Sequence, residues 1–501
     1  MAPTLVTPAP ALLHISASQS SSKTPSIELQ TATPSPLIQG SQASLNNAEP
    51  NGSAAVPDDF FVSGRFPTWR KILILFTTSW ITLAATFSST SLFPAVPEIA
   101  DEFGTVPSVV NYSNAAILVA MGLASYIWGP MSMIIGRRSA YNIALFIFFA
   151  FAIGAALAPN LQTFVAMRTL AGFEASFFMV AGQAIIADIF DPLHRGTATG
   201  FFMCGTVTGP ALGPCIGGII VTFVTWRAIF WLQAGMAASG LILSLIFVPS
   251  ITRPATEGQA TFVKSQLLSQ FSPMRVLELL IYPNILLTDI ACGCLSFTLY
   301  SLLTPPRYLI NPRFHLTTPL VSGLFYIAPG AGFFSGVLIG GRWADMTVKR
   351  YIVKREGTRL PQDRLNSGVL AFFFMVPAAT LVFGWSLQYV VGGLPVPTIA
   401  MFFSGMGLMF AFSSLNTYCA EVMPGKRVQV ITGKYFIQYC AAAAGSASIL
   451  PLINKIGVGP ACTFTSGVTM LGGVLVLITA RKGSEMQRWV DQWRKSHRDH
   501  E

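Results

Sequence analysis

The sequence predicts an all-α membrane protein whose twelve transmembrane helices form two pseudo-symmetric six-helix bundles. Three observations predict this fold class. Of the 501 residues, 52% are hydrophobic and only 10% are charged, whereas a soluble domain carries about 25% charged residues. About twelve apolar runs have the roughly 18 to 25 residues that a helix needs to cross a bilayer. The spacing of glycines and charges in the first half of the chain also recurs in the second half.

The apolar runs lack the short alternating pattern of barrel strands. We therefore expect helices, which satisfy their own backbone hydrogen bonds within lipid. The runs extend approximately over residues 72–94, 115–135, 141–159, 164–186, 198–224, 228–248, 281–304, 320–341, 368–385, 397–419, 430–452 and 460–480.

The runs divide the chain into five parts. Residues 1–65 are predicted to be a disordered cytoplasmic tail, because Ser, Thr, Pro and Ala dominate them and they cannot bury a core. Six-helix bundles over 66–250 and 281–482 follow, with a cytoplasmic linker over 251–280 between them. Residues 483–501 are predicted to be a cytoplasmic amphipathic tail on the membrane surface, since their apolar residues recur at helical spacing. A solvated end of the last helix is the alternative for this tail.

Lysine and arginine gather in alternate loops, and positive residues in short loops stay on the cytoplasmic side. With an even number of spans, both termini are then cytoplasmic. We expect a multi-pass protein of the plasma membrane, with a vacuolar or other organelle membrane as the alternative. Topology and anionic lipid account for the net charge of +10, so we expect membrane lipids and no nucleic acid as partners.

The fifth predicted span combines small residues with prolines. Glycine recurs at every fourth position, which leaves one helix face bare enough for a neighbouring helix to approach closely. Each proline removes a backbone donor and loosens the helix. Both features suit a helix that packs tightly and still moves during a conformational change. The residues are Gly205, Gly209, Pro210, Gly213, Pro214 and Gly217.

Few ionisable residues lie inside the spans, where a charge costs at least about 2.5 to 3.5 kcal/mol unless it faces a cavity or a partner. Arg168 and Glu174 belong to the fourth span, Asp289 to the seventh, and Lys434 to the eleventh, with Gln438 one turn beyond. We interpret these residues as candidate substrate or proton sites. Neutral hydrogen-bonding candidates are Asn114, Gln183, Gln233, Tyr300, Tyr326, Asn416 and Tyr439.

Each ionisable candidate also has a structural interpretation. Arg168 can bond to helix carbonyls, Glu174 can pair with a neighbour, and Lys434 can extend its ammonium to the interface. Asp289 lies near the inner end of its span, which favours a solvated helix-end role over proton transfer. Because Arg168 and Lys434 fall in different halves, two cations facing one cavity favour an anionic cargo.

The helix ends of the two halves resemble each other. Gly129 precedes Arg137 at the spacing at which Gly341 precedes Lys349. Such internal repeats around a central site are typical of secondary transporters. Three acidic residues at helix ends beside basic loops are predicted to form gating ion pairs, namely Asp188, Asp345 and Glu421.

With these motifs the chain resembles the major facilitator superfamily, specifically the twelve-span drug:proton antiporter type common in fungi, over about residues 66–482. The glycine and proline pattern from Gly205 to Gly218 is similar to the family's fifth-helix antiporter signature. Arg168 is similar to the arginine of the fourth-helix signature. The segment 188–196, which contains Arg195, is similar to the loop signature that follows it.

One departure from the family concerns the loop between the second and third spans. The family carries Asp-Arg where this chain has Met133 and Ile134. This departure removes one gating ion pair expected in the first half, whereas the resemblance implies conformational roles for the positions that still match. These are Gly129, Gly136, Arg137 and Arg138 in the first half and Asp345 in the second.

The resemblance implies alternating access in which proton uptake is coupled to export. The runs 88–97, 127–130 and 359–365 are similar to fungal secondary-metabolite exporters, including itaconate-type dicarboxylate exporters. We predict export of a small organic acid or secondary metabolite, with an itaconate-like dicarboxylate favoured. The alternatives are a multidrug:proton antiporter for hydrophobic compounds and a nutrient receptor without transport. We expect a monomer that is not an enzyme and holds no cofactor or metal, since the seven cysteines lack the spacing of a zinc site.

Overall fold

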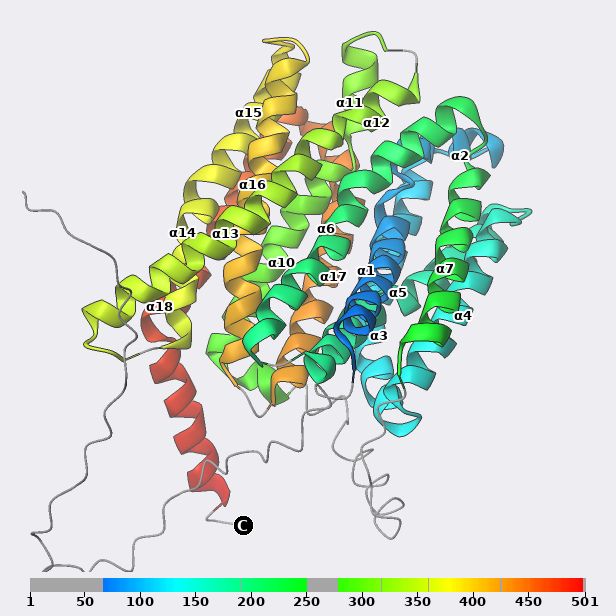
Figure 1. Ribbon diagram of the computed structural model, residues 1–501. Coiled ribbons are helices and arrows are strands. Elements are labelled where there is room, and N and C mark those ends of the chain that lie inside the picture. The colour runs from blue at the N-terminus through cyan, green and yellow to red at the C-terminus, as the bar shows by residue number, and fades with distance from the viewer. Residues whose placement is uncertain are drawn as a thin grey trace, which may run out of the picture. The chain divides into compact units, whose positions relative to one another are not determined.

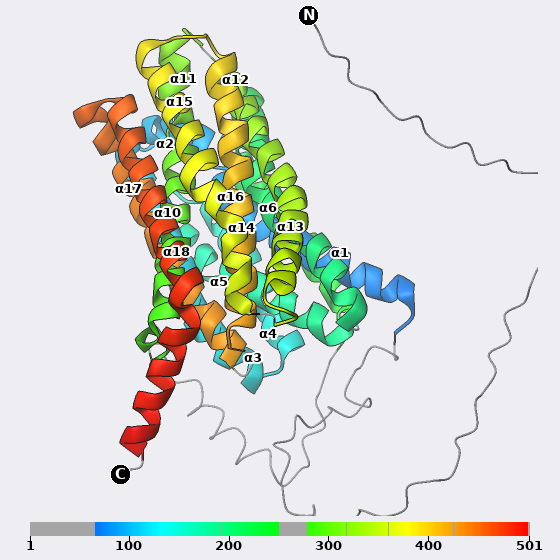
Figure 2. The ribbon, with the colours of Figure 1, turned by 90° about the vertical axis from the view of Figure 1, so that its left-hand side faces the viewer.

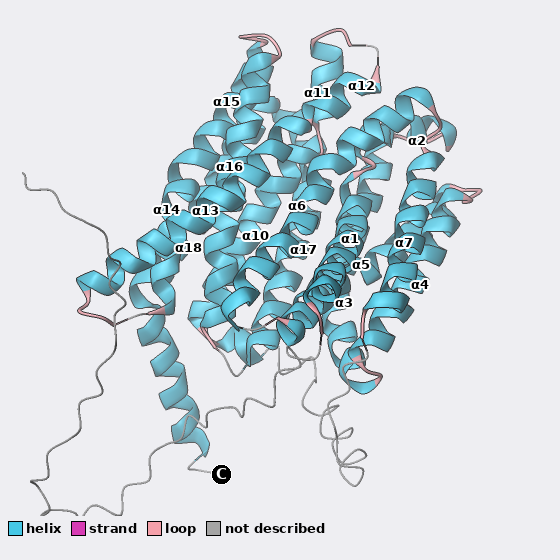
Figure 3. Ribbon diagram, in the orientation of Figure 1, coloured by secondary structure: helices cyan, strands magenta, loops and turns pink. Residues whose placement is uncertain are grey.

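The computed structural model describes residues 66–190, 192–249, 278–316, 318–358, 360–423 and 426–498. All of them belong to one compact unit, Asp58–Glu501. The predicted tail over residues 1–65, most of the predicted linker and residues 499–501 lie outside this part of the chain. Every regular element within the described residues is a helix (Figure 3).

Twelve helices in the described part of the chain are long and apolar enough to cross a membrane. Each overlaps one of the predicted apolar runs, which confirms the all-α twelve-span fold. They cover Thr68–Glu102, Pro107–Trp128, Arg137–Ala156, Leu161–Ile186, Gly200–Phe223, Arg227–Phe247, Pro283–Arg313, Pro319–Lys354, Pro361–Tyr389, Pro395–Glu421, Gln429–Ile456 and Val458–Ser496.

The first half of the chain supplies the helices coloured from blue to green in Figure 1. They are α1 (Thr68–Thr90), η3 (Phe93–Ala95), α2 (Val96–Glu102), α3 (Pro107–Ile134), α4 (Arg137–Ala156), α5 (Leu161–Ile189), α6 (Pro192–Phe223) and α7 (Arg227–Phe247). Within this half α1 packs on α6, and α4 packs on α5 and α7.

The second half supplies the helices coloured from light green to red (Figure 1). They are η4 (Glu278–Ile281), α10 (Pro283–Leu303), α11 (Pro306–Arg313), α12 (Pro319–Phe325), α13 (Ile327–Lys354), η5 (Pro361–Arg364), α14 (Leu365–Leu370), η6 (Ala371–Met375), α15 (Val376–Tyr389), α16 (Pro395–Glu421), α17 (Arg427–Ile456) and α18 (Val458–Arg498). Here α13 packs on α16, and α10 packs on α17 and α18.

The glycine face of α6 packs directly on α1, as its spacing predicts. A methyl group added at Gly209 would overlap the side chain of Thr86, and one added at Gly217 would overlap the carbonyl of Ser91. The helix runs without interruption through its two prolines. A larger residue in place of these glycines would therefore push α1 away from α6.

Two sets of helices join the halves. α3 packs on α17, where the rings of Tyr126 and Phe436 meet edge to face with centroids 5.2 Å apart. α6 packs on α12 and α13, and Gly218 faces Gly323 so closely that an added methyl would lie 2.7 Å from the Gly323 Cα. Contacts between backbones at this distance are typical of small-residue helix packing in membranes.

The bundle has two chemically different ends. We call the end that carries the starts of α4 and α17 and the η5 segment the basic end, because Arg137, Arg138, Arg364, Lys426 and Arg427 lie there. It is toward the bottom of Figure 1. The opposite end carries η3, α2 and α11, which are toward the top of Figure 1.

The predicted C-terminal tail continues the last span. α18 runs unbroken from Val458 to Arg498, and Figure 2 shows it extending past the other helices at the basic end. It packs against the start of α10, where Tyr282 Oη donates a hydrogen bond to Asp491 Oδ1 (2.9 Å) and Arg494 donates to the Glu278 carbonyl (3.1 Å). The structure thus differs from a separate helix lying on the membrane surface, because these contacts hold the tail in line with the span.

Candidate functional site

A cavity of about 410 Å³ lies between the two halves. α1, α3, α5 and α6 line it from the first half, and α10, α13, α16 and α17 line it from the second. Much of its wall is apolar and rich in methionine, a flexible side chain that adapts to ligands of different shape. The apolar lining includes Met121, Met179, Met203, Val207, Phe333, Met409 and Phe412.

Among the described residues that line the cavity, Lys434 is the one cation. It is buried on α17, and its Nζ donates a hydrogen bond to Asn416 Oδ1 on α16 (2.7 Å). The same Nζ lies 3.8 Å from the centroid of the Tyr435 ring, a distance that allows a cation–π interaction. Lys434 therefore has two local partners at membrane depth and does not extend to the interface, as one interpretation of the sequence expected.

Asp289 lies behind the cavity wall on α10. It is 0% exposed, and neither carboxylate oxygen has a hydrogen-bond partner among the described residues. Lys434 is close enough for the two side chains to interact electrostatically, although they form no direct ion pair. The expected solvated helix end is therefore wrong, because α16, α17 and α18 all pack around α10 and exclude water from this turn.

Arg168 lies on α5 within the first half and does not line the cavity. Its guanidinium donates to Ser113 Oγ (3.1 Å) and to Asn114 Oδ1 (2.9 Å) on α3. It also lies between the rings of Phe164 and Phe230, 5.4 and 5.7 Å from their centroids. The second cation expected in the cavity is thus absent from its described wall, and Arg168 instead ties α5 to α3 and α7.

Three further candidates are buried away from the cavity lining. Glu174 lies beside Trp128, and its Oε2 has no hydrogen-bond partner among the described residues. Tyr326 Oη donates to the Leu303 carbonyl (2.7 Å), and Gln233 donates to Ser88 Oγ (2.8 Å). None of these three side chains belongs to the cavity lining.

The remaining polar candidates do meet at the cavity. Gln183 from α5 and Gln438 from α17 line it together with Asn416 and Lys434, and so do Tyr300 and Tyr439. Sequence reasoning missed a set of small polar and aromatic lining residues. The α17 member, Tyr435, was detectable, because it lies three residues before Gln438 and so on the same side of the helix. The missed residues are Thr86, Ser89, Thr206, Ser296, Ser413, Thr417 and Tyr435.

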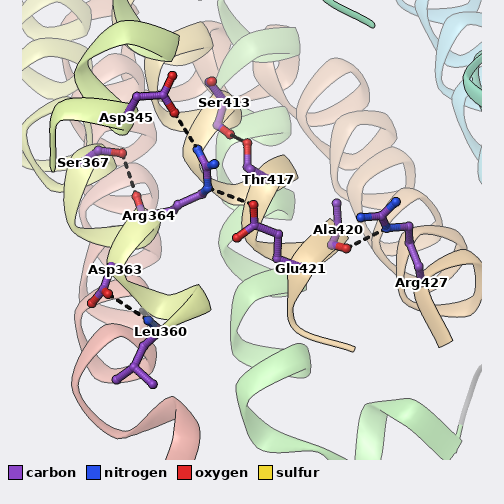
Figure 4. Close-up of polar contacts among 10 residues, drawn as sticks. All are labelled: Asp345, Leu360, Asp363, Arg364, Ser367, Ser413, Thr417, Ala420, Glu421 and Arg427. Atoms are coloured by element: carbon purple, nitrogen blue, oxygen red, sulfur yellow. Dashed lines mark hydrogen bonds and ion pairs between the residues drawn. The ribbon is translucent and has the colours of Figure 1, made fainter. Parts of the chain in front are cut away.

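The predicted gating residues form ion pairs at the basic end. In the second half Arg364 donates to Asp345 Oδ1 (3.2 Å) and to Glu421 Oε1 (3.1 Å), which connects η5 to α13 and α16 (Figure 4). In the first half Arg137 pairs with Asp188 and so connects α4 to α5. Each ion pair lies within one half of the chain, so these contacts leave the halves free to separate at this end.

The loop that precedes α4 explains why Gly136, one of the positions that match the family, is a glycine. Gly136 has a φ of +88°, a conformation that favours glycine. Beyond it, Arg138 donates to the carbonyl of Leu245 (2.7 Å) and so joins α4 to the end of α7. The side chain of Arg195 lies outside the described residues, and the roles predicted for it and for Gly129 stay predictions.

The opposite end contains an ion pair that crosses between the halves. Arg307 on α11 donates to Glu98 Oε1 on α2 (2.5 Å) and to the Pro94 carbonyl (2.8 Å). Nearby, the rings of Phe93 and Tyr300 meet edge to face with centroids 6.5 Å apart. Tyr300 also lines the cavity, so these cross-half contacts lie on the side of the cavity toward the opposite end.

The cavity lies between two helix bundles. An ion pair joins the bundles at the opposite end, whereas the ion pairs of the basic end each lie within one bundle. This arrangement is typical of a membrane transporter of small molecules. The sequence matches the family model described as Major Facilitator Superfamily over residues 78–447. The match covers most of the chain, and the protein therefore belongs to the Major Facilitator Superfamily. The resemblance noted from the motifs is confirmed.

Two curated relatives and one solved structure illustrate the similarity. The chain is 22% identical to the MFS antiporter QDR3 of Candida albicans, over 85% of this chain and 80% of that protein. It is 25% identical to the efflux pump radE of Floropilus chiversii, over 79% of this chain and 74% of that protein. The fold is similar to a partially occluded inward-open conformation of the xylose transporter XylE from E. coli, with a TM-score of 0.62 and 15% identity over 83% of this chain and 98% of that chain.

Proposed function

We propose that this protein exports a mostly apolar metabolite that carries one acidic group, by proton-coupled alternating access. The observation that carries the proposal is the placement of Lys434, a single described cation in an otherwise apolar and neutral polar wall. Ligand sites of this kind bind the bulk of a molecule through apolar contacts and orient it through a few polar groups. An ammonium at one position then selects a carboxylate or another strong acceptor.

The residues that line the cavity favour a monoacid over the dicarboxylate expected from the sequence. The expectation of an itaconate-like dicarboxylate rested on two cations facing one site, and Arg168 is held instead within the first half. A small dicarboxylate would bring a second carboxylate into a wall lined by methionines and aromatic rings. We therefore favour a larger monoacid of secondary metabolism over itaconate.

A multidrug:proton antiporter for hydrophobic compounds is the second candidate. Four methionines line the cavity, and flexible methionine-rich surfaces repack around unrelated ligands. The Candida albicans relative is described as an antiporter, and the Floropilus chiversii relative as an efflux pump, which supports an outward direction for either cargo. Under this alternative Lys434 contributes little to transport.

Alternating access would use the ion pairs at both ends. In this conformation Arg307 and Glu98 hold the opposite end together, and the ion pairs of Arg137 and Arg364 hold helix ends within each half. Opening the opposite end breaks the Arg307 contacts, while the two halves close over the basic end. A cargo shifts this equilibrium only by its differential affinity for the two states.

The membrane setting is also a proposal. We place the protein in the plasma membrane with the basic end and both termini in the cytoplasm, since cytoplasmic loops carry the excess of Lys and Arg. The cavity would then open toward the cytoplasm in this conformation. We further propose bundles over 66–250 and 281–482 and function as a monomer.

Secretion profiling tests the proposed function. Extracellular lipophilic acids, small dicarboxylates and neutral metabolites would be measured in cells that lack the protein or overproduce it. We expect a selective rise of a lipophilic monoacid on overproduction, which Lys434→Gln abolishes. Lys455→Gln, an exposed lysine on the same helix, serves as the matched control and should behave like the wild type. Altered resistance to hydrophobic drugs without any change in acids would favour the second candidate instead.

A further inference from the structure

The cavity wall contains polar groups that the described part of the chain does not satisfy. Thr206 Oγ1 on α6, Ser296 Oγ on α10 and Gln438 Oε1 on α17 line the cavity and have no hydrogen-bond partner among the described residues. A polar atom in a buried wall is costly unless water or a ligand pairs with it. A cargo that excludes water from this wall must therefore offer polar groups of its own, in addition to the acidic group that Lys434 binds.

The hydroxyl of Tyr439 is paired with a weak acceptor. Tyr439 lines the cavity from α17, and its Oη donates a hydrogen bond to the thioether sulfur of Met179 on α5 in the other half (3.2 Å). A thioether accepts hydrogen bonds only weakly. By contrast, the hydroxyl of Tyr326, which lies outside the cavity lining, donates to the Leu303 carbonyl oxygen (2.7 Å). Tyr439 can thus exchange its sulfur partner for an oxygen of a ligand in the cavity.

Packing holds the Tyr439 ring beside the cavity. The residue is 6% exposed, and its ring is stacked on that of Tyr435, with centroids 6.0 Å apart and an angle of 23° between the planes. Its Cβ also approaches α3, since a methyl group added at Gly122 would lie 3.4 Å from it. The hydroxyl is therefore held at the wall where α17 of the second half meets α3 and α5 of the first.

Lys434 and Tyr439 lie at different depths along the same helix. Five residues separate them on α17, which corresponds to a rise of about 7.5 Å toward the opposite end. Both residues line the cavity. A ligand that contacts both of them therefore lies lengthwise along α17, with its acidic group toward the basic end and the rest of the molecule toward the opposite end.

We propose that Tyr439 is a specificity-determining residue, which donates a hydrogen bond to a second oxygen of the cargo in place of Met179. The cargo is then an apolar monoacid that also carries an ether, ester or ketone oxygen, separated from its acidic group by the apolar part of the molecule. The inference rests on the proposed function, because the acidic group on Lys434 sets the position of the rest of the cargo.

Two acids that differ in one oxygen test the proposal. 6-Methoxy-2-naphthaleneacetate and 6-ethyl-2-naphthaleneacetate have the same charge and similar size, but only the first has an ether oxygen at the far end of its ring system. Titration calorimetry on the purified full-length protein in nanodiscs measures both dissociation constants. We expect the methoxy acid to bind about threefold to tenfold more tightly, the range that one net hydrogen bond gives. Equal affinities for the two acids would overturn the proposal.

Tyr439→Phe removes the hydroxyl and keeps the ring. This variant should bind the two acids equally, because affinity for the methoxy acid falls about threefold to tenfold while affinity for the ethyl acid changes little. If the preference for the methoxy acid persists in Tyr439→Phe, then the hydroxyl is not its cause and the proposal is wrong. Tyr326→Phe makes the same change at a buried tyrosine outside the cavity lining and should keep the preference.

The neutral amides of the two acids separate the role of Tyr439 from the proposed function. If the acids bind more tightly than their amides but the methoxy and ethyl acids bind equally, then only the role of Tyr439 is rejected. If each acid binds no more tightly than its amide, then Lys434 does not bind the acidic group of the cargo. The proposed function is then rejected together with the inference.

Discussion

Arg168 and Lys434 are buried cations of different halves, Arg168 toward the opposite end and Lys434 toward the basic end, and they have different surroundings. Each lies about two turns inside the start of its helix, α5 or α17. Arg168 is enclosed by two side-chain acceptors and two phenylalanine rings, whereas Lys434 faces a cavity and has an unpartnered acid behind it. A buried charge therefore does not by itself mark a transport site. The distinction lies in whether the charged side chain faces the cavity, as Lys434 does and Arg168 does not.

The largest expected effect separates the two residues by stability. Arg168→Ala should lower the free energy of unfolding by about 3 kcal/mol, because it removes charged hydrogen bonds and leaves a void between two rings. Chemical denaturation in detergent measures the loss. Transport per folded molecule should be retained, and Arg168→Lys should recover part of the stability. If Arg168→Ala keeps normal stability but loses transport, then Arg168 takes part in transport itself.

The second prediction concerns the selectivity of the cavity. Lys434→Met should reduce uptake of 1-naphthaleneacetate, an apolar monoacid, into proteoliposomes about tenfold, which corresponds to about 1.4 kcal/mol of binding free energy. Uptake of 1-naphthaleneacetamide, the neutral amide of this acid, should change little, since the apolar wall is preserved. Parallel assays of both compounds on the same vesicles measure the ratio. An equal loss for acid and amide would indicate that Lys434 is structural, as Arg168 is.

The third prediction addresses the contact between the halves. Arg307→Gln removes the cross-half ion pair with Glu98, and we expect the open population at the opposite end to rise about fivefold, or about 1 kcal/mol. Spin labels at Asp101 and His315 would report the separation by electron resonance. Arg227→Gln breaks an ion pair that lies within the first half, so its distance distribution should match the wild type. If both variants show the same distance distribution, then the ion pair of Arg307 does not hold the two halves together at the opposite end.

The smallest effect compares the ion pairs at the basic end. Arg364 binds two carboxylates in the second half, whereas Arg137 binds one in the first. Partly exposed ion pairs contribute about 0 to 1 kcal/mol, so Arg364→Gln should destabilise the protein slightly more than Arg137→Gln. Paired thermal-unfolding curves measure the difference. A larger effect from Arg137→Gln would show that the first half depends more on its ion pair than the geometry indicates.

Much of the fold could be predicted because membrane insertion is a local property of sequence. Length and hydropathy decide whether a segment can cross lipid, and all twelve runs are helices in the structure. The glycine spacing in α6 likewise predicted close packing, since small residues at helical intervals leave one face bare. The acidic residues at helix ends were predicted to form ion pairs, but Arg364, the partner of Asp345 and Glu421, was not identified from the sequence.

The tertiary structure alone decided which polar side chains meet. Spacing places a residue on a helix but leaves the rotation of that helix toward its neighbours undetermined, so Arg168 and Lys434 could not be told apart. From the sequence Asp289 was expected to be solvated. In the structure α16, α17 and α18 pack around α10 and bury it. The sequence by itself determined a twelve-span membrane protein with few buried charges. Helix rotation and packing determined that Lys434 faces the cavity, because these depend on contacts between segments far apart in the chain.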